Sequence, residues 1–256
     1  MRFWLIAIWN TIPRRWVIIA TPVVLPALAL LGWWLLGGLF VKPPDPGYVA
    51  AQTELSRLLP AAEKGDRVAQ MRAATIYRDG LTGKVDGPEA VRWFNEAMKR
   101  GDAEAPLMLG DLYARGLGVR QDYARAAELF RAAANFGRSA EAQYRLGDLY
   151  AYGRGLPQDY SMAIEWLRKA ALRGHAGAQS YLGSFYENGY GVDRDLVDAY
   201  VWYALAAGNQ VSALAYRPDI DPKALAEKLK AGLNRLQQRD AERKLAETRK
   251  AIRSSS

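Results

Sequence analysis

A run of 26 residues without a charge, at positions 16–41, dominates the hydrophobic pattern of the chain. About 20 apolar residues in a helix are enough to cross a bilayer core. Pro22 and Pro26 lie inside the run, and helices in lipid tolerate proline. Trp16 and Trp33 lie toward its two ends, where interfacial aromatic residues occur. The run therefore predicts one uncleaved transmembrane helix.

A cleaved signal peptide is the alternative interpretation of the same run. Ala27-Leu28-Ala29 resembles a small-residue cleavage motif. However, the apolar stretch continues to Val41 with no polar mature start, and it is too long for the hydrophobic part of a signal. The uncleaved helix is favoured for that reason.

The charges beside the run predict its orientation. Arg2, Arg14 and Arg15 precede it, whereas only Lys42 follows closely, with Asp45 beside it. The flank richer in arginine and lysine usually stays in the cytoplasm. We therefore expect a single-pass protein of the inner membrane, with a cytoplasmic N-terminus and the rest of the chain in the periplasm of a Gram-negative bacterium.

Two short segments flank the predicted span. Residues 3–12 are apolar but too few to cross a bilayer, and we expect residues 1–15 in the cytoplasm or at the membrane interface. Residues 42–49 contain three prolines, which stiffen a chain and interrupt helices. We expect a short spacer there.

After the spacer, one pattern of apolar and polar positions recurs with a period of 36 or 37 residues. An aspartate follows each repeated tyrosine after nine residues. The tyrosines are Tyr77, Tyr113, Tyr150 and Tyr186, and the aspartates are Asp86, Asp122, Asp159 and Asp195. Periods of this length indicate stacked helix pairs, because one pair alone cannot bury its apolar face. The pattern predicts repeats at 66–101, 102–137, 138–174 and 175–210, with a half-repeat helix at 50–65.

Each copy contains the signals of two helices and a turn. In the third copy, Gly147 follows Leu146 where two helices must approach closely, and Asp159 is expected to cap the second helix through backbone N–H groups. Gly174 is expected to end that helix at positive φ. Fixed recurrence favours packing and capping roles for the tyrosines and aspartates over an aromatic binding surface or a carboxylate array. His175 is expected to be a solvated residue at a helix start, the less favoured alternative being a pH sensor or catalytic base.

These residues closely resemble the Sel-like (Sel-one-like) repeat family, relatives of tetratricopeptide repeats. The family pattern is A-x-x-x-L-G-x-x-Y-x-x-G-x-G-V, and the segments from Ala105 to Val119 and from Ala178 to Val192 match it. The first copy departs, with Ala73-Ala74 in place of Leu-Gly and Thr82 in place of the second turn glycine. The resemblance implies an all-α, right-handed α/α solenoid of four helix-pair repeats, and it implies a scaffold or regulator rather than an enzyme.

Composition narrows the chemistry. The chain has no cysteine and one histidine, which excludes disulfides, thiolate zinc sites, iron–sulfur clusters and multi-histidine metal sites. We expect no catalytic residue, cofactor or metal. The net charge of +8 lies at the two ends of the chain, because residues 48–216 carry 20 basic and 20 acidic residues.

The first helices of tetratricopeptide-like solenoids line the concave face. Three positions of each first helix share an outward stripe, and these are our candidate partner-binding groove: Arg72, Thr75, Asp79, Met108, Asp111, Arg115, Arg145, Asp148, Tyr152, Tyr181, Ser184 and Asn188. Tyrosine and arginine are typical interface residues. An ordinary solvated face is the alternative.

Residues 211–256 depart from the repeat. Residues 216–220 form a link, and Asp221-Pro222 starts a last helix with a stripe of leucines (Leu225, Leu229, Leu233 and Leu236) suited to capping the solenoid. Basic residues gather beyond it: Arg239, Arg243, Lys244, Arg249, Lys250 and Arg253. They indicate either a solvated helix or a surface for an anionic lipid, an acidic polysaccharide or an acidic protein.

The sequence therefore predicts a membrane-anchored, non-enzymatic scaffold that binds a membrane or periplasmic protein through its groove. One alternative is an envelope enzyme or glycan-binding protein that uses Asp111 and Asp148 as an acid/base pair. Another is a cytosol-facing binder of nucleic acid or ribosomes through the basic tail. Nucleic acid is not expected if the orientation is as predicted.

Overall fold

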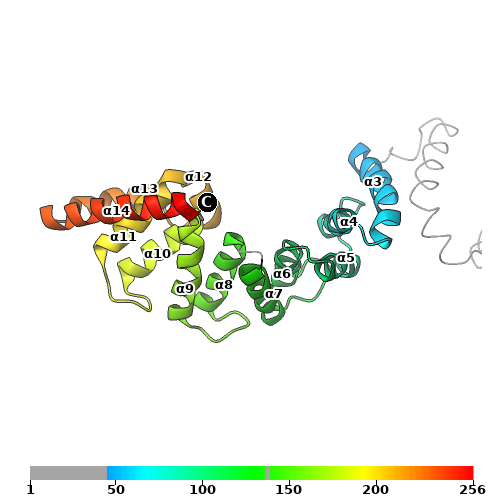
Figure 1. Cartoon of the computed structure of the whole chain (residues 1–256), viewed down its shortest axis with the longest axis horizontal. Helices are drawn as coiled ribbons and strands as arrows, with labels where there is room; N and C mark the ends of the chain where they lie inside the picture. Colours follow the sequence, from blue (N-terminus) through cyan, green and yellow to red (C-terminus); the bar gives the residue numbers. More distant parts are fainter. Residues whose placement is uncertain (1–44, 137–138, 256) are drawn as a thin grey trace, which may run out of the picture. The chain divides into compact units, whose positions relative to one another are not determined.

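The computed structural model describes residues 45–136 and 139–255, and these residues form helices and connecting loops without a strand (Figure 1). The predicted N-terminal segment 1–15, the predicted transmembrane helix 16–41 and residues 42–44 of the spacer lie outside the described residues. Among the helices that are described, none is both long and apolar enough to cross a bilayer.

The described residues form two compact units. The first, residues 45–105 with 117–120, contains α3 (Pro46–Glu63), α4 (Arg67–Asp79) and α5 (Gly87–Lys99). The second, residues 106–116 with 121–255, contains the other helices. These are α6 (Ala105–Arg115), α7 (Tyr123–Phe136), α8 (Ala140–Tyr152), α9 (Tyr160–Leu172), α10 (Ala176–Asn188), α11 (Leu196–Ala206), η1 (Ala207–Asn209), α12 (Gln210–Tyr216), α13 (Pro222–Gly232) and α14 (Arg235–Ser255). The pairs α4–α5, α6–α7, α8–α9 and α10–α11 lie within the four predicted repeats.

The nine-residue spacing between tyrosine and aspartate closes the loop of each pair. The backbone N–H of Asp159 donates to the carbonyl of Tyr150 at 3.0 Å, and the other three copies make the equivalent bond at 2.9–3.0 Å. The Asp159 carboxylate then accepts the backbone N–H of Met162 at 2.9 Å. The capping role predicted for the repeated aspartates is confirmed.

The glycine after the repeated leucine allows close contact within a pair. A Cβ added at Gly147 would lie 2.7 Å from Leu167, and one at Gly183 would lie 2.5 Å from Tyr203. A side chain at either glycine would therefore force Leu167 or Tyr203 to move. In the first copy Ala74 occupies this position and is fully buried.

Large side chains of the second helices fill the core of each unit. Trp93 and Phe94 are buried in the first unit, and Trp166, Leu167 and Tyr203 in the second. Burying each such side chain is worth about 1.5–3 kcal/mol. The repeated tryptophans are core residues, as their fixed position predicts.

The helix α3 begins earlier than the sequence analysis expects. The Asp45 carboxylate accepts the backbone N–H of Gly47 at 2.7 Å and caps the helix, and Pro46 occupies its first turn. Proline suits this position because the first-turn N–H has no partner inside the helix. Residues 46–49, expected in the spacer, are therefore helical.

The prediction of a single helix after Asp221 is wrong, because the chain breaks between α13 and α14. Leu233 is extended (ψ 139°), and the Asn234 side chain accepts the backbone N–H groups of Leu236 and Gln237 at 3.0 Å. The Gln237 side chain accepts the Asn234 N–H in return, so the pair forms a reciprocal cap. Leu236 is 76% exposed and does not belong to the buried stripe.

Candidate functional site

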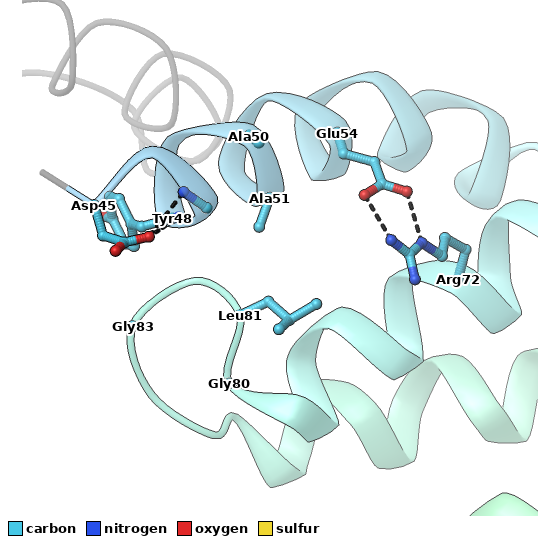
Figure 2. A pocket seen from close by; sticks show the side chains of 10 residues that line it. Asp45, Tyr48, Ala50, Ala51, Glu54, Arg72, Gly80, Leu81 and Gly83 are labelled. Atoms are coloured by element: carbon cyan, nitrogen blue, oxygen red, sulfur yellow. Dashed lines mark hydrogen bonds and ion pairs between the residues drawn. The ribbon is translucent and has the colours of Figure 1, made fainter.

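In the first unit, the predicted groove residue Arg72 on α4 is joined to α3. Its Nε and Nη2 donate to the two carboxylate oxygens of Glu54 at 2.6 and 2.8 Å (Figure 2). This hydrogen bond from Arg72 lowers the pKa of the Glu54 carboxyl. Asp79, at the end of α4, pairs with Arg78 at 2.7 Å. Both predicted residues are exposed and carry a paired charge.

A shallow hollow of about 380 Å³ lies beside this ion pair. Its lining includes Asp45, Tyr48 and Ala51 of α3, with Leu81 and Gly83 from the loop after α4 (Figure 2). Figure 2 shows Leu81 pointing toward α3, and Leu81 is 42% exposed. The hollow can accept an apolar side chain, and sequence reasoning did not find it.

In the second unit, α6 carries Met108, Asp111 and Arg115. Arg115 donates to Asp111 at 3.2 Å, one helical turn away, and 62% of the Arg115 side chain is exposed. A pair of this kind stabilises a helix by only a few tenths of a kcal/mol. Arg115 is therefore free to turn toward a partner at little cost.

On α8, the groove residues are tied to their neighbours to different degrees. Arg145 donates to Glu141 at 2.7 Å. Asp148 accepts the hydroxyl of Tyr181 at 3.2 Å, and burial raises the pKa of its carboxyl against the opposing charge of Arg154. Tyr152 is 51% exposed. It is the aromatic residue of the face that a partner can reach most easily.

On α10, the predicted residues differ in accessibility: Asn188 is exposed, Ser184 is half-buried and Tyr181 is buried. Tyr181 is only 3% exposed, although its position in the repeat is that of Arg72. Asn188 uses its side-chain amide to bond the carbonyl of Ser184 at 2.8 Å. The link at residues 216–220 contributes to the burial, because the guanidinium of Arg217 lies 4.1 Å above the Tyr181 ring.

The expectation of a solvated His175 is wrong. Its side chain is 7% exposed and caps α10, where Nδ1 accepts the backbone N–H of Ala178 at 3.1 Å. Nε2 therefore bears the proton and donates to Glu141 at 3.0 Å. The ring also stacks on Tyr144, with centroids 4.5 Å apart.

Glu141 is the centre of a half-buried polar cluster that the sequence did not predict. Burial opposes its ionisation, but hydrogen bonds from His175 and Tyr216, helped by Arg145, outweigh this and lower its pKa to about 2. The Tyr216 hydroxyl donates to Glu141 at 2.5 Å across 75 residues of sequence. One signal was available, because His175 occupies the capping position that Asp66 and Ser139 hold in other copies.

The basic tail is partly neutralised within the fold. Lys244 pairs with Asp198 of α11 at 2.6 Å, and Arg243 pairs with Asp240 and Glu247. Arg239, Arg249, Lys250 and Arg253 are exposed and form no ion pair with any described residue. Four of the six predicted tail residues thus present an unpaired charge on α14.

Comparisons with known proteins identify the repeat. A family model described as Sel1 repeat matches residues 25–48, 67–102, 103–135, 140–175 and 176–210. The first matched segment overlaps the predicted membrane span and lies almost wholly outside the described residues. The other four matches coincide with the predicted repeats to within a few residues.

The chain is also similar to solved structures and to a curated protein. A Sel1 repeat protein from Oxalobacter formigenes aligns with a TM-score of 0.57 and 26% identity over 73% of this chain and 83% of that one. A protective antigen of uropathogenic Escherichia coli with an SLR fold aligns with a TM-score of 0.48 and 24% identity, over 89% of this chain and 54% of that one. The ERAD-associated E3 ubiquitin-protein ligase component HRD3B of Arabidopsis thaliana is 40% identical over 76 residues, which span 29% of this chain and only 11% of that relative.

Proteins built from Sel1 repeats are generally non-catalytic scaffolds for protein interaction. The family model covers more than half of the chain, and the described residues form the all-helical repeat pairs of this fold. The chain belongs to the Sel1 repeat family.

Proposed function

We propose that this protein is a membrane-anchored, non-enzymatic scaffold that holds a partner protein on the exposed face of its first helices. The observation that carries the proposal is the contrast between the two sides of these helices. The side with the Leu-Gly pair packs on the second helix, while the opposite side keeps Arg115 and Tyr152 exposed at equivalent positions of α6 and α8. Arginine and tyrosine are enriched among residues that dominate binding energy.

The alternative of an envelope enzyme that uses Asp111 and Asp148 has less support. Asp111 is bound to Arg115, and Asp148 is bound to Tyr181 and lies 3.8 Å from Arg154. Both carboxylates therefore have structural partners. An Asp111→Asn/Asp148→Asn variant should keep its partner-binding function if the scaffold proposal is correct.

Crosslinking tests the binding face directly. A photoreactive amino acid is placed at Arg115 or Tyr152 of the full chain in native membranes. Matched controls are Glu128 and Glu165, which are exposed at equivalent positions of the second helices α7 and α9. We expect discrete adducts from the first pair only, identified by mass spectrometry. Equal adducts from the controls, or adducts from the controls alone, would contradict the proposal.

The proposed membrane anchor is residues 16–41, with the repeats in the periplasm. The length and apolarity of the run and its flanking arginines support it. Alkaline phosphatase fused after Ser256 should be active, and the chain should stay with membranes after a carbonate wash. A chain released by carbonate would instead favour residues 25–48 as a further repeat, and an inactive fusion on a membrane-bound chain would invert the orientation.

An anionic surface is the proposed second partner, contacted through α14. The exposed and unpaired charges of Arg239, Arg249, Lys250 and Arg253 support this part of the proposal. A lipid headgroup or an acidic polysaccharide in the envelope presents the complementary charge.

A further inference from the structure

The link at residues 216–220 contacts the first helices α8 and α10. It begins with Tyr216, the last residue of α12, and continues as a turn in which the backbone N–H of Ile220 donates to the carbonyl of Arg217 at 3.1 Å. It joins the end of α12 to Asp221, the extended residue that caps α13. Its Arg217 lies over Tyr181, a residue that the repeat pattern assigns to the partner-binding groove. The chain's own segment therefore shows what this part of the groove can hold.

The first contact is a tyrosine site. The ring of Tyr216 lies 4.4 Å from the ring of His175 and meets Tyr144 edge-on at 5.1 Å, while its hydroxyl donates to Glu141. Burial and this hydrogen bond raise the pKa of Tyr216 to about 12. A Cβ added at Gly177 would lie 2.6 Å from the Cβ of Tyr216. The tyrosine ring thus packs against the rings of Tyr144 and His175 and against the backbone of Gly177, and its hydroxyl donates to the Glu141 carboxylate.

The second contact is an arginine site. The guanidinium of Arg217 lies 4.1 Å above Tyr181, and 14% of the Arg217 side chain is exposed. Its Nε and Nη2 donate to Asp219 of the link itself at 2.9 and 2.6 Å. Asp219 of the link therefore neutralises the charge of Arg217, and Tyr181 of the groove supplies an aromatic face for the guanidinium.

The hold of the link on the groove is incomplete. The remaining guanidinium nitrogen of Arg217, Nη1, is buried and makes no hydrogen bond with any described residue. A buried donor without a partner costs free energy. A partner segment whose arginine has all its guanidinium N–H groups hydrogen-bonded in this site would avoid that cost, and it could therefore displace the link.

We propose that the groove of α8 and α10 binds a short segment of a partner protein that carries a Tyr-Arg pair with an acidic residue two positions later, and that the link occupies this site until the partner displaces it. The inference rests on the proposed scaffold function. It specifies the residues that the partner segment carries, and it makes the link an internal competitor of the partner. A tethered segment competes at a high effective concentration. Partner affinity is therefore set by how often the link leaves the groove.

The test uses a fluorescein-labelled peptide of residues 212–222 and the purified full chain. In the Tyr216→Ala/Arg217→Ala variant the link loses both contacts, while Glu141 and Tyr181 remain. By fluorescence anisotropy, we expect the peptide to bind this variant at least about tenfold more tightly than the wild-type chain, whose link competes. A peptide with alanine in place of its tyrosine and arginine should not bind either chain.

Two results would overturn the proposal: an opened variant with wild-type helix content that does not bind the peptide, and equal binding by the variant and the wild-type chain. If the double alanine variant has lost helix content, Tyr216→Phe/Arg217→Gln replaces it, under the same criteria. Crosslinking at Arg115 and Tyr152 of the wild-type chain does not require the link to move. Failure of the peptide with success of the crosslinking would therefore reject this inference and leave the scaffold function standing.

Discussion

Arg72 in the first unit and Tyr181 in the second occupy the same position of the repeat, yet their surroundings differ. The Arg72 side chain is 45% exposed, and its partner Glu54 belongs to the preceding helix. Tyr181 is 3% exposed, and Arg217 of the link lies over its ring. The repeat places a residue on the first-helix face, whereas segments outside the repeat decide whether a partner can reach it.

The largest expected loss of stability follows from substitutions on the buried side of the first helices, which both units share. Leu146 is fully buried, and Leu146→Ala should destabilise the full chain by about 2–5 kcal/mol through lost burial and a cavity. Arg115→Ala on the exposed side should stay within about 0.5 kcal/mol. Chemical denaturation followed by circular dichroism measures both. Similar effects would contradict the assignment of the two sides.

The next effect concerns the cluster that holds the link. Glu141 has a pKa of about 2 in the fold, below its ordinary value of 4.5, so its ionised form stabilises the fold fully above pH 4.5 and this contribution disappears as pH falls through 2. A shift of this size corresponds to about 3 kcal/mol.

A Glu141→Gln variant lacks this titration. The difference in unfolding free energy between the wild-type chain and the variant should therefore shrink between pH 5 and pH 2, as measured by denaturation at each pH. A constant difference would show that Glu141 does not titrate as described.

A smaller loss of stability is expected from substitution of Arg72, which occupies in the first unit the repeat position that Tyr181 holds in the second. Arg72 and Glu54 are both about half exposed, and exposed ion pairs contribute about 0–1 kcal/mol. Arg72→Ala should therefore lower the melting temperature less than Arg217→Ala, which uncovers Tyr181. The reverse order would mean that the first unit, and not the second, depends on contacts of the first-helix face.

The smallest effect concerns the tail. Arg249→Gln/Lys250→Gln/Arg253→Gln should weaken binding of the full chain to anionic vesicles relative to Lys64→Gln/Arg100→Gln/Arg120→Gln, which removes as many exposed charges elsewhere. Each basic residue near an anionic surface contributes about 1 kcal/mol, and salt should reduce the difference. Vesicle flotation at low and high salt measures it. Equal binding by the two variants would indicate that α14 is a solvated helix with no role in binding an anionic surface.

The sequence was sufficient for features that repeat within one helix pair. The spacing of Tyr150 and Asp159 corresponds to a backbone hydrogen bond, and Gly147 corresponds to a close contact with Leu167, so both follow from local geometry. The Glu141–Tyr216 bond could not be predicted, because it joins residues 75 positions apart through a link that belongs to no repeat. The same reason hid the burial of Tyr181 and His175.

The break between α13 and α14 was missed for a different reason. The leucine spacing through Leu229, Leu233 and Leu236 continues the helical pattern across the break. The reciprocal cap of Asn234 and Gln237 was visible in the sequence and outweighs that pattern, because it satisfies the first N–H groups of α14.

Hydroxyl-radical footprinting of the full chain tests most directly whether the link closes the groove. Tyr152, which is 51% exposed, and Tyr203, which is 1% exposed in the core, serve as internal references. In the wild-type chain Tyr181 should be as protected as Tyr203. In Tyr216→Ala/Arg217→Ala its oxidation should rise toward that of Tyr152 while Tyr203 stays protected. Continued protection of Tyr181 in a folded variant would contradict the account, because its burial would then come from the helix pairs and not from the link.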